Sequence, residues 1–432
     1  MTAFDDVDFF TDRSLVADPY PYFEYLRNRC PVAALPHHGV VAVTGYDEMI
    51  DVLRDTDTFS SCNAVTGPFP GLPVRPEGDN VDDLIAQHRH MMPMSEYLIT
   101  KDGTDHAERR SLLKRLLTPN RMRENEEAIW PLADAQIDEF IDRGRFEVIG
   151  DYARPFAILV IADLLGVPEE DRSEFRRQLS TIDLPEVKGR NGQAHKQKRE
   201  PRRDPLAFLF EKVTGYVESR RRNPQPDVLT ALANATYPDG RTPAVADVVR
   251  TASFLFAAGG DTTTRLLAAA MRIIAEQPDV AELLRSRRDM LPNFIDEVLR
   301  IESPVKSAFR LARKSTTVGG VDIAAGTVVM LPLGAANRDP RRYDRPDEFR
   351  ADRPNAQTHL SFGRGVHTCP GGPLSRTEVR ISLERLLDRI SDFRVSTIHH
   401  GPPDARRFVY EPTYILRGHT ALHLDFTPAA RA

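Results

Sequence analysis

The sequence predicts a mainly α-helical protein with small β-sheets, folded as one large domain. Most of the chain shows the apolar spacing typical of amphipathic helices, and glycine or proline separates one segment from the next. Short β-type runs are expected after the longest helical segment. No repeat or low-complexity tract divides the 432 residues, so we expect a single unit over residues 1–432.

Helices are expected wherever an amphipathic segment ends at a breaker. The first ends before Thr118 and Pro119, the next stops at Gly144, and the third ends at Gly166. The expected helices cover residues 112–117, 124–142, 152–165, 169–182 and 206–222. A basic, polar run at 188–203 lies between the last two, and we expect it to be a solvated loop.

The longest apolar segment, 244–276, lies between Pro243 and Pro278. As one helix it would measure roughly 50 Å, which is enough to cross the molecule, so its middle should be buried. The elements expected after it are short strands within 316–323 and 327–331, an irregular stretch at 339–354, a helix over 374–390 and strands within 408–426.

The composition excludes several classes of protein. Lysine and arginine number 58 against 63 aspartates and glutamates, so the net charge of −5 favours neither nucleic acid nor an anionic membrane as partner. Cys30, Cys62 and Cys369 are too few and too far apart for a disulfide framework, which favours a reducing compartment. No signal peptide and no run of about 20 apolar residues is visible. We therefore expect a cytoplasmic protein without membrane insertion.

The loop from Phe362 to Gly371 presents Cys369 among glycines, including Gly363 and Gly365. Glycine is used where backbone must approach a ligand closely, so the loop indicates a large, flat partner beside the thiol. The helix expected next begins beside the cysteine, and its dipole would favour a thiolate.

Other interpretations of Cys369 stay open at this point. Free cysteine is often a buried structural residue. A hydrolase nucleophile with His367 as its base is disfavoured, because the two lie two residues apart in one loop and lack an orienting third group. A zinc site built on the same pair lacks two further ligands.

The long helix contains Gly259 and Gly260, each of which costs about 1 kcal/mol relative to alanine in a helix interior. Close approach of a planar ligand or a local widening of the helix would compensate for that cost. Asp261 and Thr262 then place an acid and a hydroxyl where they could relay protons into a dry pocket. The alternative is a helix packed tightly on a neighbour, with Thr262 bonding back to a carbonyl.

Two further pairs stand at helical spacing. Glu297 and Arg300 place opposite charges on one face within an apolar segment, so a buried ion pair with a further partner is expected. His106 and Arg110 lie one turn apart and could both donate to an anionic group. Taken alone, each of these is more often an ordinary surface or packing residue.

Together these motifs resemble the soluble bacterial cytochrome P450 family of haem-thiolate monooxygenases, over nearly the whole chain. The cysteine loop resembles the family's Phe-x-x-Gly-x-x-x-Cys-x-Gly pattern, the long helix its oxygen-binding motif, and Glu297 with Arg300 its Glu-x-x-Arg pair. One departure is Ser375, where the family usually has alanine.

The resemblance implies that Cys369 is the axial ligand of haem b, iron protoporphyrin IX, and that Asp261 and Thr262 are catalytic. It assigns cofactor binding to His106, Arg110, Ala258, Gly259, Arg310, Phe362, Gly363, His367, Cys369 and Gly371. It makes Arg353 the third partner of the Glu297–Arg300 structural pair. It places Val305, Ala308, Phe309 and Tyr414 in the substrate pocket.

The implied reaction inserts one oxygen atom of O2 into a hydrophobic small molecule, by hydroxylation or epoxidation. No fused reductase is expected, so electrons would come from a separate ferredoxin-type donor to a monomeric enzyme. Arg109, Lys114, Arg115 and Arg364 are candidates for docking that donor, although a merely solvated basic face fits them equally. The alternatives are a peroxygenase or isomerase, which the presence of Asp261 and Thr262 disfavours, and a non-catalytic haem-binding protein.

Overall fold

The helices begin and end at the breakers that the sequence provides. The computed structural model describes residues 4–74, 76–179 and 205–429. In it α5 spans Gly103–Leu116 and α6 follows over Pro119–Asp138. Thr118 caps α6 because its side-chain oxygen accepts from the backbone N–H of Arg121. The helix α7, Arg154–Leu164, ends before Gly166, whose positive φ suits a helix terminus.

The other helices among the described residues complete a mainly α-helical fold. They are α1 (Ser14–Ala17), α2 (Tyr20–Arg29), α3 (Tyr46–Arg54), α4 (Asp82–His88), α8 (Glu169–Leu179), α9 (Pro205–Arg222), α10 (Val228–Ala233), α11 (Val245–Glu276), α12 (Pro278–Ser286), α13 (Leu291–Glu302), α14 (Leu333–Ala336), α15 (Gly372–Arg389) and α16 (Thr397–His400). The predicted fold class is thereby confirmed. The predicted loop at 188–203 and the predicted helical residues 180–182 lie outside the described residues.

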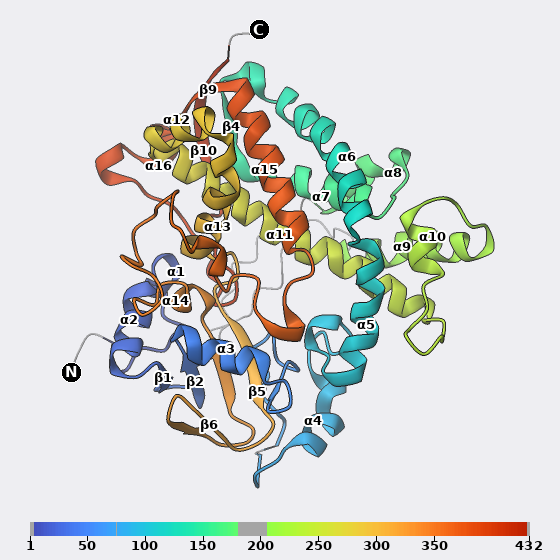
Figure 1. Ribbon diagram of the computed structural model, residues 1–432, viewed down its shortest axis with the longest axis vertical. Helices are drawn as coiled ribbons and strands as arrows, with labels where there is room; N and C mark the ends of the chain where they lie inside the picture. Colours follow the sequence, from blue (N-terminus) through green and yellow to red (C-terminus); the bar gives the residue numbers. More distant parts are fainter. Residues whose placement is uncertain (1–3, 75, 180–204, 430–432) are drawn as a thin grey trace, which may run out of the picture.

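The long helix α11 runs through the centre of the molecule, as its apolar length predicts. The largest core cluster joins it to α6, α7, α13 and α15. Figure 1 shows α6 and α15 side by side although they are more than 200 residues apart in the chain. A second core cluster joins α11 to α5 and α8–α10. Among the described residues, no helix combines the length and apolar character needed to cross a bilayer.

Three small sheets accompany the helices. The first has the order β1 (Val32–Ala34), β2 (Val40–Val43), β8 (Val328–Leu331), β5 (Ala308–Ala312), β3 (Phe59–Ser60). All its neighbouring pairs are antiparallel except β2 and β8. The second has the order β4 (Arg145–Glu147), β10 (His423–Pro428), β9 (Ile390–Val395), and the third pairs β6 (Thr316–Val318) with β7 (Val321–Ile323). The first sheet lies at the lower end in Figure 1 and the second at the upper end.

The C-terminal strands were predicted over too long a range. Alternating residues over 408–426 predicted strands within that range, whereas β10 begins only at His423. The preceding residues are irregular and make isolated bridges between Tyr410 and His419 and between Val305 and Leu416. Alternation shows which residues could share a face of a sheet, but a strand also needs a neighbouring strand to pair with.

Candidate functional site

The cysteine loop is held in shape by its own backbone and by its glycines. The N–H of Cys369 donates to the carbonyl of Phe362 at 2.8 Å. Gly363 and Gly365 both have positive φ, and a Cβ on Gly365 would lie 2.8 Å from the carbonyl oxygen of Leu53 in α3. The loop therefore rests directly on α3 and leads into α15 at Gly372.

Cys369 is a free cysteine, and the protein around its sulfur affects the ionisation of the thiol. Burial raises the pKa of this thiol, while hydrogen bonds from the backbone N–H groups of Gly371 and Gly372 and the charge of Arg110 act in the opposite direction. The expected pull of the helix dipole toward a thiolate is thus outweighed by burial. A bound metal ion would reverse this balance, because a coordinating thiol is deprotonated outright.

Four hydrogen-bond donors converge near the loop. The rings of His106 and His367 lie 4.0 Å apart between their centroids. Arg110 donates to the carbonyl of Thr368 at 2.6 Å. Arg310 has both histidines within the range of its charge. Helix α5, strand β5 and the cysteine loop thus bring together all four predicted donors.

This group lacks a partner of negative charge. Among the described residues, no ion pair includes His106, Arg110, Arg310 or His367. Asp102 is the carboxylate whose charge acts on His106, Arg310 and His367, but it is engaged by Arg89 and by the backbone N–H of Ser61. Burial, followed by the charge of Arg110, lowers the pKa of His106 to about 4. Burial, followed by the charge of Arg310, lowers that of His367 to about 3.

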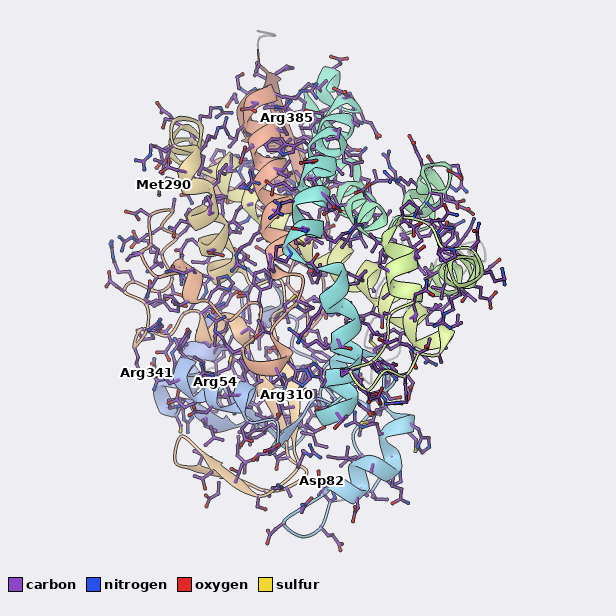
Figure 2. All side chains as sticks on the ribbon, turned by 45° about the vertical axis from the view of Figure 1, so that its right-hand side comes forward. Arg54, Asp82, Met290, Arg310, Arg341 and Arg385 are labelled. Carbon is purple, nitrogen blue, oxygen red and sulfur yellow. The ribbon has the colours of Figure 1, made fainter. Side chains whose placement is uncertain are left out.

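Among the four donors, Arg310 is the one whose charge is most clearly buried without a negative partner. Figure 2 shows it well inside the outline of the molecule, whereas Arg341 and Asp82 lie near the edges. It is 5% exposed, its Nη1 donates to the carbonyl of Phe309 at 2.7 Å, and burial lowers its pKa to about 10. A buried, uncompensated guanidinium is costly, so this corner of the site suits an anionic ligand.

The middle of α11 lies near the start of α15, where the hydroxyls of Thr263 and Ser375 are 3.3 Å apart. Ala258, Gly259, Asp261 and Thr262 are half-buried, whereas the turns that follow are buried. The helix continues through both glycines without the widening that we considered. A Cβ on Gly259 would lie 2.6 Å from Cδ1 of Ile161 in α7, so this glycine permits tight helix packing. The hydroxyl of Thr262 donates to the carbonyl of Ala258 at 2.7 Å, as the packing interpretation expected.

Asp261 belongs to an ion-pair chain that sequence reasoning missed. Nε of Arg265 donates to Asp261 at 2.8 Å, and its Nη2 donates to Glu411 at 2.6 Å. Arg265 is 6% exposed. The i,i+4 spacing of Asp261 and Arg265 was the available signal, but the partner from the C-terminal segment had none. These ion pairs connect Asp261, the candidate acid of α11, to the C-terminal segment.

Glu297, Arg300 and Arg353 form a buried triad against the segment that precedes the cysteine loop. Glu297 accepts from Nε of Arg300 at 2.7 Å and from Nε of Arg353 at 2.9 Å, and all three side chains are at most 1% exposed. The two arginines also donate to backbone carbonyls of the irregular stretch, at Asn337, Asp344, Arg345, Pro346 and Glu348. The triad therefore fixes the segment that leads to Cys369.

The four predicted pocket residues divide into two groups. Val305 and Ala308 are half-buried, and Ala308 shares its face of β5 with Arg310. Phe309 points to the opposite face and is 0% exposed. It packs against Tyr414, whose hydroxyl donates to the carbonyl of Thr66 at 2.7 Å. Both side chains belong to a buried aromatic cluster, and their assignment to the substrate pocket stays a prediction.

Fewer residues remain as candidates for docking the electron donor. Arg109 is largely buried and paired with Asp247 at 2.8 Å, so it is not free for a partner. Arg364 is half-buried and donates to the carbonyl of Thr358. Lys114 remains exposed, and the side chain of Arg115 lies outside the described part of the chain.

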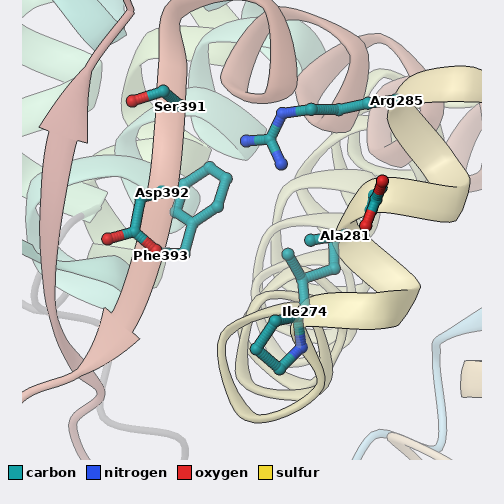
Figure 3. Close-up of a pocket in the computed structure, with 8 residues that line it drawn as sticks. Ile274, Ala281, Arg285, Ser391, Asp392 and Phe393 are labelled. Atoms are coloured by element: carbon teal, nitrogen blue, oxygen red, sulfur yellow. The ribbon is translucent and has the colours of Figure 1, made fainter.

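A surface hollow lies elsewhere, at the C-terminal end of α11. It has a volume of about 260 Å³ and is bordered by α12 and β9, with Arg285 facing Phe393 (Figure 3). None of the predicted site residues lines it. No cluster of three or more His, Cys, Asp or Glu side chains in the described ranges could hold a metal ion.

Comparisons with known proteins agree with this arrangement. The family described as Cytochrome P450 matches residues 175–408. The chain is 30% identical to 6-deoxyerythronolide B hydroxylase of Saccharopolyspora erythraea, over 95% of this chain and 97% of the relative. The substrate-free structure of cytochrome P450 CYP150A6 from Mycobacterium marinum is 56% identical, with a TM-score of 0.93 over 99% of this chain and 100% of the other. CYP109E1 of Bacillus megaterium, in complex with corticosterone, is 26% identical with a TM-score of 0.78, over 94% and 98%.

The chain belongs to the cytochrome P450 family. It is a monooxygenase of that family, whose members bind haem and use O2, a redox partner and small-molecule substrates. The predictions of family, enzyme class and cofactor are confirmed.

The residues at the site fit haem. Cys369 supplies a free thiol with N–H donors beside it, which is the ligand that a haem-thiolate protein needs. The four donors without a carboxylate partner suit the two propionate groups of the cofactor. The buried and unpaired charge of Arg310 is the observation that best supports the fit to haem.

Proposed function

We propose that this enzyme hydroxylates or epoxidises a hydrophobic small molecule, with electrons from a separate ferredoxin and its reductase. The observation that supports the proposal most is the convergence of unpaired donors, including the buried Arg310, on the Cys369 loop. When bound, haem supplies the activation of O2 and the oxidising power.

The residues around it would bind, orient and move protons. Cys369 would hold the iron, and His106, Arg110, Arg310 and His367 would hold the propionates. Phe362, Gly363 and Gly371 would shape the loop, and Ala258 and Gly259 the opposite wall. The hydroxyl of Thr262 would pass protons that Asp261 takes up from solvent. Val305 and Ala308 would contact the substrate.

The proposal is tested by turnover of the holoenzyme. Substrate should be consumed with NAD(P)H, ferredoxin and reductase, in proportion to the O2 used. Product formed only with added peroxide would indicate a peroxygenase instead. Product that contains no oxygen from O2 would indicate an isomerase.

Thr262→Ala is expected to separate electron use from product formation. The variant loses the hydroxyl that donates to Ala258, so oxygen is still reduced but protons reach it in the wrong place. Product per NAD(P)H should fall on the order of 100-fold, the lower end of the contribution of a positioned proton-transfer group. The measurement is the ratio of product to NAD(P)H consumed.

Thr251→Ala is the matched control for this variant. Its hydroxyl makes the same bond, to the carbonyl of Asp247 at 2.8 Å, about 16 Å away along the helix. This variant should keep its coupling. Equal coupling in Thr262→Ala and the parent enzyme would remove Thr262 from the mechanism.

Arg310→Gln is expected to weaken haem binding without harming the fold. Hydrogen bonds to charged groups contribute about 1.5–3 kcal/mol, so haem affinity should fall about 10- to 100-fold. The free energy of unfolding of the apoprotein should stay equal or rise, because a buried unpaired charge is removed. Arg272→Gln provides the contrast, since Arg272 pairs with Glu302 at 2.6 Å and its loss should destabilise the apoprotein. A destabilised Arg310→Gln apoprotein with unchanged haem affinity would show that Arg310 is a structural residue.

We further propose a monomer with one haem domain over residues 1–432 and no nucleic-acid partner, acting in the cytoplasm. Size-exclusion chromatography with light scattering tests the monomer. Fractionation of the source cells tests the location.

A further inference from the structure

Lys306 is a buried lysine without a negatively charged partner. It is 5% exposed, and its Nζ donates to the carbonyl of Thr413 at 2.9 Å. An ammonium group has three N–H donors and accepts nothing. Among the described residues no ion pair includes Lys306, so two of its donors have no protein partner.

The carboxylates of this region are already engaged by arginines. Glu302 pairs with Arg272 at 2.6 Å and with Arg417 at 3.1 Å. Although burial opposes it, these arginines lower the pKa of Glu302 to about 2. Glu411 and Asp261 are likewise held by Arg265. The nearby carboxylates are therefore paired with arginines and not with Lys306.

The charges that act most on Lys306 are positive. Burial, followed by repulsion from Arg417 and Arg265, lowers the pKa of Lys306 to about 7. The side chain can thus exist in either form near neutral pH. A negative group placed beside it would favour the charged form.

Lys306 stands among the residues expected to contact substrate. Val305 and Ala308 on either side are half-buried, and Val305 bridges to the half-buried Leu416. Lys306 precedes β5, and its backbone N–H, like that of Ser307, donates to the carbonyl of Ile415, next to Leu416. An apolar wall beside a spare cation that is not one of the four predicted propionate donors is what a hydrophobic molecule with one acidic group requires.

We propose that Lys306 binds a carboxylate of the substrate, so that this enzyme acts on hydrophobic carboxylic acids. The inference rests on the proposed function and names the substrate class of that site. The two spare N–H groups would donate to the carboxylate oxygens, while the apolar body would lie along Val305 and Ala308. A monoanionic carboxylate suits a single ammonium, whereas a phosphate dianion would call for an arginine fork.

Binding of three matched probes to the haem-loaded enzyme tests the proposal. The probes are dodecanoic acid, dodecanol and dodecylamine, which share a chain length and differ in the head group. Dissociation constants are measured from the haem spin-state change and, independently of haem, by calorimetry. At about pH 6.5 the acid should bind at least about 10-fold tighter than the alcohol, and the amine weakest.

The preference should depend on pH with a definite sign. The ammonium form, which binds the acid, prevails below the pKa of Lys306, while the carboxylate stays ionised above about pH 5. The affinity for the acid should therefore fall about 10-fold from about pH 6.5 to about pH 8.5. The affinity for the alcohol should not change.

Variants distinguish this role from a structural one. Lys306→Met should abolish the preference for the acid and leave alcohol binding unchanged, whereas Lys306→Arg should keep the preference and lose its pH dependence. Lys101→Met is the matched control, since Lys101 is also buried but pairs with Glu96 and Asp105; it should bind like the parent enzyme.

Equal binding of acid and alcohol by the parent enzyme, or a preference that survives in Lys306→Met, would overturn the proposal. Each variant is first checked for the thiolate-haem spectrum of its carbon monoxide complex. A normal spectrum without acid preference would refute only this inference. An absent spectrum in the parent enzyme would instead refute the proposed function.

Discussion

Replacing Cys369 with serine is expected to abolish monooxygenase activity while leaving the fold intact. The thiolate pushes electron density toward haem iron, which favours cleavage of the O–O bond, and a serine hydroxyl does not ionise to replace it. Activity should fall by roughly three orders of magnitude or more, which corresponds to at least about 4 kcal/mol of activation free energy. The reduced carbon monoxide complex should lose its strongly red-shifted Soret band.

Cys30→Ser is the control for this prediction. Cys30 is a half-buried free cysteine just after α2, outside the candidate site. Its variant should keep both the spectrum and the activity. A red-shifted band that persists in Cys369→Ser would show that another residue ligates the iron, and a colourless parent protein would contradict haem binding altogether.

Much of the fold could be predicted because its signals are local. Thr118 with Pro119, Gly166, and the prolines around α11 each end or begin a helix through the conformation of one or two residues. The irregular structure at 408–422 could not be predicted in the same way. Its residues alternate, but a strand exists only where another segment offers hydrogen bonds, and that information is not local.

The candidate site divides along the same line. His106 with Arg110, and Glu297 with Arg300, could be paired from helical spacing alone. The contacts of Arg265 with Glu411 and of Lys306 with Thr413 could not be predicted, since more than 100 residues separate the members of each pair. The placement of Phe309 was available from the sequence, because strand alternation turns it away from Arg310.

Glu297→Gln is expected to lower stability more than other substitutions that keep the shape of a side chain and remove its charge. The change leaves Arg300 and Arg353, both at most 1% exposed, without the carboxylate that balances them. Removing one member of a buried ion pair costs about 3–5 kcal/mol because a charge stays buried without compensation. The free energy of unfolding, measured in urea on the haem-loaded enzyme, should fall by that amount.

The loss should also reach the haem. The arginines hold the irregular stretch that leads into the cysteine loop through carbonyls such as those of Asn337 and Asp344, so haem should dissociate from the variant at lower urea than from the parent enzyme. Asp289→Asn is the control: it breaks a pair with Arg287 of the same 2.7 Å length, but both side chains are more than half exposed, and exposed pairs contribute about 0–1 kcal/mol. If both variants lose the same stability, burial is not what gives the triad its strength, and its arginines must be balanced by the backbone carbonyls alone.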